Sequence, residues 1–280
     1  MTDPTQAPSL VSYVPGLGRR PVLVTGASGV LGRAVVAELA ASHTPVRAIS
    51  RHPDAQQQAD GWLAADLAAG TGLEQALADV AAVIHCATDP SDAQRVDVDG
   101  TRNLISALEQ HNPAARLVYV SIVGVFDNPF PYYRAKADAE RLVYDARVPH
   151  VVARGTQFHS FVHDLLRPRG GVTVGVSGLR FAPVDQAWFA ARLVDLALAE
   201  DPPELSQYAG PETFTFQELA ALTAHVEGRR TPFRLPAPAI GATLRAFRDG
   251  SNLPGPTALR GGATYAEWLA TRSGGTKQAR

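Results

Sequence analysis

From residue 21 onward the chain alternates short β-branched apolar runs with longer stretches rich in alanine and leucine. The short runs predict buried strands, and apolar residues spaced three and four positions apart in the longer stretches predict helices. A helix between two strands returns the chain to the same edge of a sheet, so the strands run parallel and helices cover both faces. The pattern therefore predicts an α/β fold with a doubly wound parallel sheet.

The predicted elements become shorter along the chain. Six strands are expected in the first part, at 22–25, 46–50, 61–66, 81–87, 116–121 and 150–155. The helices between them are expected near 30–42, 73–78, 91–111 and 132–146. Later signals indicate strands at 172–176 and 207–210, and helices at 185–200, 215–227 and 264–270. We therefore predict a loosely packed leader at 1–20, the main sheet at 21–155, and further sheet elements with a small C-terminal α+β cap at 156–280.

Composition narrows the classes of ligand and compartment. Lys and Arg number 26 against 27 Asp and Glu, a formal net charge of −1, which argues against nucleic-acid and anionic-membrane partners and favours a small-molecule ligand. The single cysteine, Cys86, excludes an intramolecular disulfide and fits a reducing compartment. No apolar run reaches the ~18 residues of a membrane-spanning helix, and the leader lacks a signal-peptide pattern. We expect a cytoplasmic protein, monomeric or homodimeric.

A glycine-rich turn follows the first predicted strand. VLVT runs directly into GASGVLG and then into a helical stretch, so Gly26, Gly29 and Gly32 lie between strand and helix. Glycines in this place permit positive φ, let backbone N–H groups approach a pyrophosphate, and direct the positive end of the helix toward its charge. The turn therefore predicts dinucleotide binding. The predicted cofactor-binding residues are Gly26, Ser28, Gly29, Val30 and Leu31.

Several segments together resemble one family. TGASGVLG, SIVGV, YYRAKADAE, RGTQFHSFV and AGPETFTFQELA resemble the extended and atypical short-chain dehydrogenase/reductases, in particular the NmrA-like, NAD(P)-binding proteins. The resemblance covers about residues 21–272. It implies a Rossmann sheet that binds NADPH or NADH at 21–155 and a substrate-binding cap at 156–280.

The resemblance also implies further cofactor contacts. In this family the end of the second strand selects the cofactor, and Arg51 stands there instead of an acid. A guanidinium pairs bidentately with a 2′-phosphate, so Arg51 favours NADPH, with NADH as the alternative. Asp66 and Leu67 resemble the adenine-contacting pair, and Ala87 lies in the segment that resembles the one along the pyrophosphate. Asp97 departs from the family, which usually has Asn there, and its role stays open.

Tyr132 and Lys136 form the candidate reactive centre. Four residues apart, they share one face of a predicted helix and match the Tyr-x-x-x-Lys pair of the family. The resemblance implies that the phenol is the general acid or base, and that the ammonium lowers the phenol's pKa and holds the nicotinamide ribose. Ser121 is the candidate third member, although the family's catalytic hydroxyl would fall on Val123. A serine bonded to nearby backbone is the alternative.

The segment after the sixth strand supplies the candidate substrate contacts. Gln157 and His159 lie where the resemblance places the substrate pocket, and an imidazole there can polarise a carbonyl or move a proton. A histidine that only packs in the helix is the alternative for His159. No residues have metal-ligand spacing, and no GxSxG turn occurs, so metal and hydrolase functions are not expected.

The leading interpretation is an enzyme, an NADPH-dependent oxidoreductase that transfers hydride to a small carbonyl, enone or quinone-like substrate. An NmrA-like protein that senses nicotinamide redox state without turnover is the first alternative, favoured by Val123. Retention of Tyr132 and Lys136 argues against it. A sugar-nucleotide epimerase or dehydratase is the second alternative. Such an enzyme holds NAD tightly, and Arg51 speaks against NAD.

Overall fold

The computed structural model describes residues 20–167, 172–231 and 233–277. These residues form two compact units, each made of separate stretches of chain. The first unit comprises 20–121, 135–153 and 190–206, and the second comprises 122–134, 154–189 and 207–277 within the described ranges. The predicted leader at 1–20 lies outside the described residues except for its last residue. The division of labour between a cofactor part and a substrate part at residue 155 stays a prediction.

An eight-stranded sheet forms the centre of the fold, in the order β12-β9-β6-β5-β4-β1-β2-β3. Its strands are β1 (Val22–Thr25), β2 (Val46–Ser50), β3 (Leu63–Ala64), β4 (Ala82–His85), β5 (Arg116–Ile122), β6 (His150–Gly155), β9 (Leu205–Ala209) and β12 (Leu259–Arg260). The pairs β1–β2, β2–β3, β1–β4, β4–β5 and β9–β12 are parallel. The chain winds from β1 outward to β3 and then back across β1 to β4 and β5, which confirms the doubly wound Rossmann sheet.

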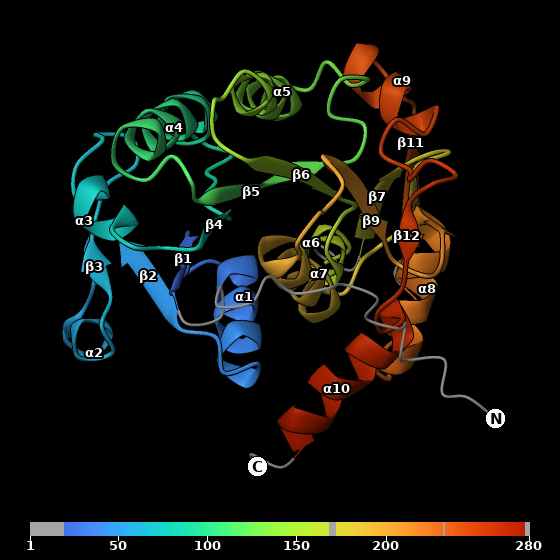
Figure 1. Ribbon diagram of the computed structural model, residues 1–280. Helices are drawn as coiled ribbons and strands as arrows, with labels where there is room; N and C mark the ends of the chain where they lie inside the picture. Colours follow the sequence, from blue (N-terminus) through green and yellow to red (C-terminus); the bar gives the residue numbers. More distant parts are fainter. Residues whose placement is uncertain (1–19, 168–171, 232, 278–280) are drawn as a thin grey trace. The chain divides into compact units, whose positions relative to one another are not determined.

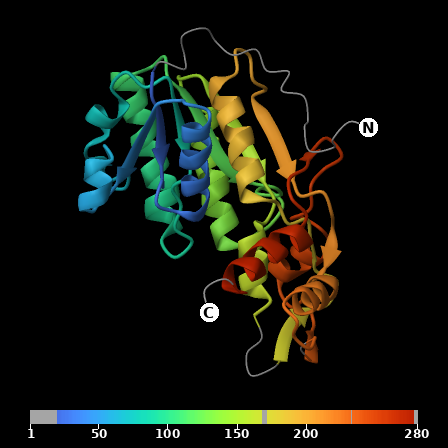
Figure 2. The ribbon, with the colours of Figure 1, turned by 90° about the horizontal axis from the view of Figure 1, so that it is seen from below.

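Helices cover both faces of the sheet in the first unit. They are α1 (Val30–Ala41), α2 (Ala55–Ala59), α3 (Leu73–Leu77), α4 (Gly100–His111), residues 135–144 of α5 (Pro131–Tyr144) and residues 190–198 of α7 (Gln186–Leu198). Figure 1 shows α4 and α5 on one face and α1 on the other. In the view of Figure 2 these helices run alongside the strands. Coverage on both faces explains why every residue of β1 and β4 is buried.

The core of this unit joins strands and helices that are distant in sequence. Its fully buried members include Leu23 from β1, Val83 from β4, Leu117 from β5, Leu77 from α3 and Leu104 from α4. Apolar burial of this kind contributes roughly 25 cal/mol per Å² of surface removed from water. The apolar faces that predicted these elements from the sequence are the faces that meet in the core.

Three elements of the first unit differ from the prediction. The third strand was expected over 61–66 but contains only Leu63–Ala64, because Asp66 pairs antiparallel with Thr71 and turns the chain back. The helix expected over 91–111 consists of a π-helical segment at Gln94–Asp99, followed by α4. The short helix α2 was not predicted. Its sequence AQQQA has no apolar face, and a capping box at Asp54 starts it.

The second unit is a mixture of small sheets and helices. Strand β8 (Arg180–Phe181) pairs antiparallel with β10 (Phe214–Thr215), and β7 (Val172–Val176) pairs parallel with β11 (Phe233–Ala237). Its helices include α6 (His159–Leu165), α8 (Phe216–Val226), α9 (Ala242–Arg248) and α10 (Tyr265–Lys277). A separate apolar core holds α6, α8 and α10 together through Val162, Leu219 and Leu269. Among the described residues, no helix is both long enough and apolar enough to cross a membrane.

Candidate functional site

The glycine-rich turn connects β1 to α1, as predicted. Gly26 has a φ of 63°, and a Cβ atom on it would lie 2.7 Å from the Cα atom of Ala87. A Cβ on Gly32 would strike the carbonyl oxygen of Gly26. Close packing within the protein therefore requires glycine at both positions.

Gly29 is glycine for a different reason. It is exposed, has an ordinary φ of −72°, and the nearest atom to an added Cβ would be the Gly26 oxygen at 3.1 Å. As the N-cap of α1 it makes no side-chain cap bond, and the first turn of α1 contains no acid. The exposed position of Gly29 therefore leaves room for a pyrophosphate, which would accept hydrogen bonds from the N–H groups at the start of the helix.

The other predicted residues of the turn differ in exposure. Ser28 is exposed, and its carbonyl oxygen accepts a bond from the Arg33 guanidinium. Val30 is 53% exposed, whereas Leu31 is buried. At this turn, therefore, only the backbone of Leu31 is available to a ligand.

The segment after β4 lies against this turn. The backbone N–H of Ala87 donates to Thr25 Oγ1 over 3.3 Å, which holds the end of β4 beside the end of β1. Thr25 Oγ1 is also 2.6 Å from His85 Nδ1. The carboxyl ends of β1 and β4 thus meet at the point where chain direction switches in a doubly wound sheet, which is where such folds bind ligands.

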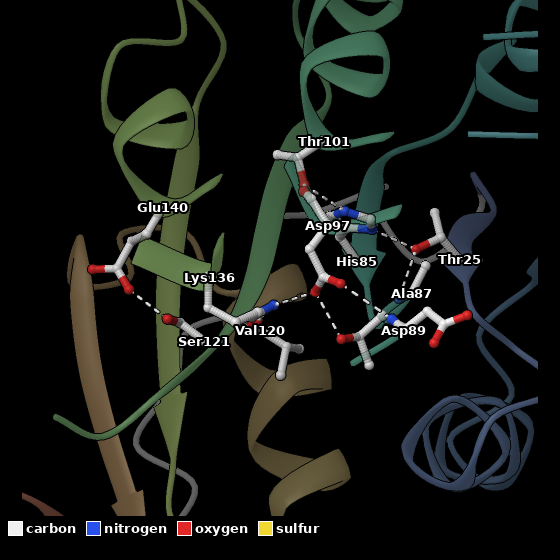
Figure 3. Close-up of polar contacts among 11 residues, drawn as sticks. Thr25, His85, Ala87, Asp89, Asp97, Thr101, Val120, Ser121, Lys136 and Glu140 are labelled. Carbon is white, nitrogen blue, oxygen red and sulfur yellow. Dashed lines mark hydrogen bonds and ion pairs between the residues drawn. The ribbon is translucent and has the colours of Figure 1, made fainter. Parts of the chain in front are cut away.

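Lys136 on α5 is buried, and its side chain reaches the neighbouring strand β5. Figure 3 shows its polar contacts. Its ammonium donates to the carbonyl oxygen of Val120 over 2.7 Å and lies 4.3 Å from the centre of the Tyr119 ring. An ion pair joins Lys136 Nζ to Asp97 Oδ1 at 3.5 Å, with side chains that are 5% and 0% exposed. A buried cation needs such a partner, because burial of an unpaired charge is strongly unfavourable.

Asp97 is the residue whose role the sequence left open. Its Oδ1 atom also accepts from the Thr88 hydroxyl over 2.7 Å, and its Oδ2 atom accepts from the Asp89 N–H over 3.1 Å. The π-helical segment thereby connects the loop after β4 with Lys136 on α5. An asparagine in this place would keep the size of the side chain and lose the charge.

A buried hydrogen-bond chain fixes the protonation of His85. Thr101 Oγ1 donates to the Asp97 carbonyl oxygen, so it must accept from His85 Nε2–H, 3.0 Å away. Thr25 Oγ1 then donates to the unprotonated Nδ1 atom. Burial and, to a smaller extent, the charge of Lys136 lower the pKa of His85 to about 3. The imidazole is therefore neutral and serves as a structural connector.

Ser121 does not point a free hydroxyl at the site. Its Oγ atom donates to the carboxylate of Glu140, and both side chains are buried. Val123, where the resemblance would place the catalytic hydroxyl, is 2% exposed. Glu140, which lies one turn after Lys136 on α5, was not predicted as a site residue. Its spacing from Lys136 is a signal that could have placed it on the buried face of the helix.

The remaining predicted cofactor contacts lie in the first unit. Arg51 is exposed directly after β2. Bonds from Ser91 lower the pKa of Asp89, and the charge of Arg51 adds to this effect. The Asp66 Oδ1 atom accepts from the N–H groups of Ala68 and Ala69. Leu67 packs in the core, and its carbonyl oxygen accepts from the Asn103 side chain. Contacts of these residues with a cofactor stay predictions.

The two predicted substrate residues lie in the second unit and are engaged with protein groups. His159 is 0% exposed, its Nε2 atom bonds the Ala263 carbonyl oxygen at 2.9 Å, and its ring packs against Trp268. Burial lowers its pKa. Gln157 bonds the Tyr133 phenol, whose pKa burial raises to about 12. The packing alternative for His159 is the one that this geometry favours. Tyr132 is half-buried in α5, one turn before Lys136.

The comparisons with known proteins identify the family. The model of the NAD(P)H-binding family matches residues 26–169, just over half of the chain, and the chain belongs to this family. The match includes the glycine turn, the segment after β4 and Lys136. It confirms the predicted nicotinamide cofactor and agrees with the resemblance to NmrA-like, extended short-chain dehydrogenase/reductases.

Relatives and solved structures give the wider context. Uncharacterized proteins of Mycobacterium tuberculosis and Mycobacterium bovis are 36% identical over 101 residues, which cover 36% of this chain and 12% of theirs. The chain thus spans about an eighth of the length of these curated relatives.

Three solved structures share the fold. An NADPH-dependent quinone oxidoreductase from Escherichia coli has a TM-score of 0.75 at 19% identity, covering 90% of this chain and 99% of its own. Citrobacter triphenylmethane reductase has a TM-score of 0.72 at 17% identity, and the match covers 90% of this chain and 99% of the reductase. A nucleoside-diphosphate-sugar epimerase from Staphylococcus aureus has a TM-score of 0.73 at 16% identity, and the match covers 89% of this chain and 99% of the epimerase.

Among the described residues, no group of His, Cys, Asp and Glu could hold a metal ion.

The two kinds of glycine predict separable defects. Gly32→Ala should lower the free energy of unfolding by more than about 2 kcal/mol, because its Cβ overlaps backbone atoms. Gly29→Ala should change stability by less than about 1 kcal/mol yet weaken NADPH binding at least tenfold, about 1.4 kcal/mol. Urea unfolding and calorimetric titration measure the two effects. Unchanged NADPH affinity in Gly29→Ala would remove the pyrophosphate from this turn.

The lowered pKa of His85 should make the stability of the folded protein sensitive to acid. Its pKa is about 3 in the folded protein against 6.5 when unfolded, so between these values the unfolded chain binds a proton that the folded chain cannot. Its contribution to the free energy of unfolding should be fully present above pH 6.5 and fall by about 1.4 kcal/mol per pH unit below it. His85→Gln should lack this part of the slope in urea unfolding. His111→Gln, at an exposed position, is the control, and equal slopes in all three proteins would contradict the assignment.

Proposed function

We propose that the protein is an NADPH-dependent reductase that delivers hydride to a small carbonyl, enone or quinone-like acceptor. The observation that carries the proposal is the meeting, at the carboxyl ends of β1, β4 and β5, of the glycine turn, residues 86–89 and the buried Lys136. Ligands of doubly wound sheets bind at this edge. The single free cysteine, Cys86, supports a reducing, cytoplasmic location.

The residues at this edge fit the parts of the cofactor. The open face of Gly29 and the N-terminus of α1 would hold the pyrophosphate. Arg51, exposed after β2, would pair with the 2′-phosphate and select NADPH over NADH. Lys136 would hold the nicotinamide ribose. When bound, the reduced nicotinamide supplies the hydride.

Tyr132 and Lys136 would carry the proton chemistry. Tyr132 lies at the first turn of α5 and would donate its phenolic proton to the substrate oxygen as the negative charge develops there. Lys136 is fixed by Val120 and Asp97 and would keep the ribose in place. The substrate-binding role of residues 156–280 stays a prediction from the resemblance. The similar structures from Escherichia coli and Citrobacter, a quinone oxidoreductase and a triphenylmethane reductase, support this class.

One observation favours a second candidate, an NmrA-like protein that senses nicotinamide redox state without turnover. The Ser121 hydroxyl is engaged by Glu140, and the residue at the expected catalytic hydroxyl is the buried Val123. A protein without that hydroxyl can still bind the cofactor. The two candidates therefore differ in turnover and not in cofactor binding.

Arg51→Ala tests the cofactor preference. We expect NADPH affinity to fall at least tenfold, about 1.4 kcal/mol, with little change for NADH, since only NADPH carries the 2′-phosphate. Calorimetric titration with each cofactor measures this. Arg102→Ala is the matched control, because Arg102 is also an exposed arginine of the first unit, on α4. Equal losses for both cofactors would remove the phosphate role of Arg51.

Tyr132→Phe tests the reaction. NADPH oxidation is first screened against quinones, enones and aromatic aldehydes. With an accepted substrate, Tyr132→Phe should bind NADPH as the wild type does and lose about 10²-fold or more in kcat, because the proton donor is gone. Tyr133→Phe, the neighbouring buried phenol, is the control. Good NADPH binding without oxidation of any substrate would favour the sensor, and no binding would refute both candidates.

A further inference from the structure

Acidic side chains accompany the positive charge of Lys136. Lys136 and Asp97 form an ion pair from which water is almost excluded. From the same helix, the buried Glu140 lies one turn further along, with Ser121 donating to its carboxylate. The ammonium is therefore accompanied by one carboxylate in direct contact and a second one nearby.

Within the described part of the chain, Tyr119, His85 and Cys86 also interact with Lys136. Tyr119 from β5 presents its ring to the ammonium, and burial together with Asp97 and Glu140 raises the pKa of its phenol. From the end of β4, His85 and Cys86 sense the charge of Lys136. The imidazole is neutral, and burial raises the pKa of the Cys86 thiol to about 12. Lys136 is the cation of this group, and Asp97 is its direct counterion.

Tyr132 lies one turn before Lys136 on α5, so the two side chains share one face of the helix. A lone ammonium at that spacing favours the phenolate and lowers the pKa of a phenol by about 1–3 units. A carboxylate bound to the same ammonium opposes this effect, because the field of a closely spaced ion pair falls off faster than that of a single charge.

We propose that Asp97 is a positioning residue that holds Lys136 in place and cancels most of its field on Tyr132, so that Tyr132 remains a protonated phenol near neutral pH. This inference rests on the proposed function and adds the direction of the reaction, reduction of the substrate. A protonated phenol donates a proton and is a poor base, so the site serves reduction and not the oxidation of an alcohol.

The proton and electron balance of the reduction is complete. With NADPH as reductant, the carbonyl carbon of the substrate gains hydride while its π bond breaks, and the electron pair moves to the oxygen. The O–H bond of Tyr132 breaks, and its proton forms the new bond to that oxygen, giving the alcohol. The phenolate recovers a proton from solvent. Asp97 contacts neither substrate nor cofactor in this scheme and acts through Lys136.

The first experiment requires no substrate. Ultraviolet titration of the wild type minus that of Tyr132→Phe isolates the absorbance change of the Tyr132 phenol. We expect a midpoint near that of an ordinary tyrosine, about 10. A midpoint two or more units lower would show that Lys136 acts with its full charge and would overturn the proposal.

Asp97→Asn then removes the charge and keeps the size of the side chain. With the carboxylate gone, the Tyr132 midpoint should fall by about one unit, measured against the double variant Asp97→Asn/Tyr132→Phe. Asp99→Asn is the matched control, because Asp99 is a partly exposed acid two residues later that pairs with Arg102, and its removal should leave the midpoint unchanged. An unchanged or raised midpoint in folded Asp97→Asn would overturn the proposal.

Two safeguards keep the result interpretable. Loss of one partner of a buried ion pair destabilises a protein, so native folding of Asp97→Asn is checked by its NADPH binding. If it does not fold, the wild-type titration alone decides. Failure of the reductase is a separate outcome, since it appears as absence of turnover with any substrate. The titration midpoints can still confirm or refute the role of Asp97 in that case.

Discussion

At the end of β1 the backbone of Gly26 lies so close to Ala87 that no side chain fits between them. This approach fixes the turn after the central strand against the loop after its neighbour β4, and Gly32 sets the start of α1 against the same turn. The helix N-terminus, the loop at 86–89 and the end of β5 thereby share one edge of the sheet. The buried ion pair of the candidate site depends on this packing, because Lys136 donates to the Val120 carbonyl oxygen of β5 and Asp97 accepts from Thr88 and Asp89 in the loop after β4.

Five polar residues buried at this edge form one network of hydrogen bonds and an ion pair. Thr25, His85 and Thr101 form a directed chain of hydrogen bonds that ends on the Asp97 carbonyl, and the Asp97 side chain binds Lys136 and the loop after β4. A buried polar group without a partner costs about 1–3 kcal/mol, so a network in which each member is satisfied tolerates little change. The same bonds that stabilise the strand ends therefore also hold the lysine that the cofactor would meet.

The sequence predicted the elements whose patterns are local and strong, namely β1, β2, α1, α5 and the glycine turn, as well as the doubly wound order of the sheet. It missed α2, which a cap starts without an apolar face, and it overextended β3, because the pairing of Asp66 with Thr71 is not visible in hydrophobic periodicity. For the site, the spacing of Tyr132 and Lys136 predicts that they act together, and this stays a prediction. The contacts of Asp97 with Lys136 and of Glu140 with Ser121 could not be predicted, because they form only when the π-helical segment, α5 and β5 pack together.

The charge of Asp97 matters for the chemistry that the proposed site could support. Asparagine and aspartate have nearly the same shape, so both can accept the N–H of Asp89, and the fold permits either. They differ by one buried charge next to the ammonium that the resemblance assigns to activation of the phenol. With asparagine there, Lys136 would be free to favour the phenolate of Tyr132 and hence a base. With aspartate, and with Ser121 engaged by Glu140, the same helix and strand would present a neutral proton donor. Under the proposed role of Asp97, the buried charge at this edge would therefore decide whether Tyr132 acts as a proton donor or as a base.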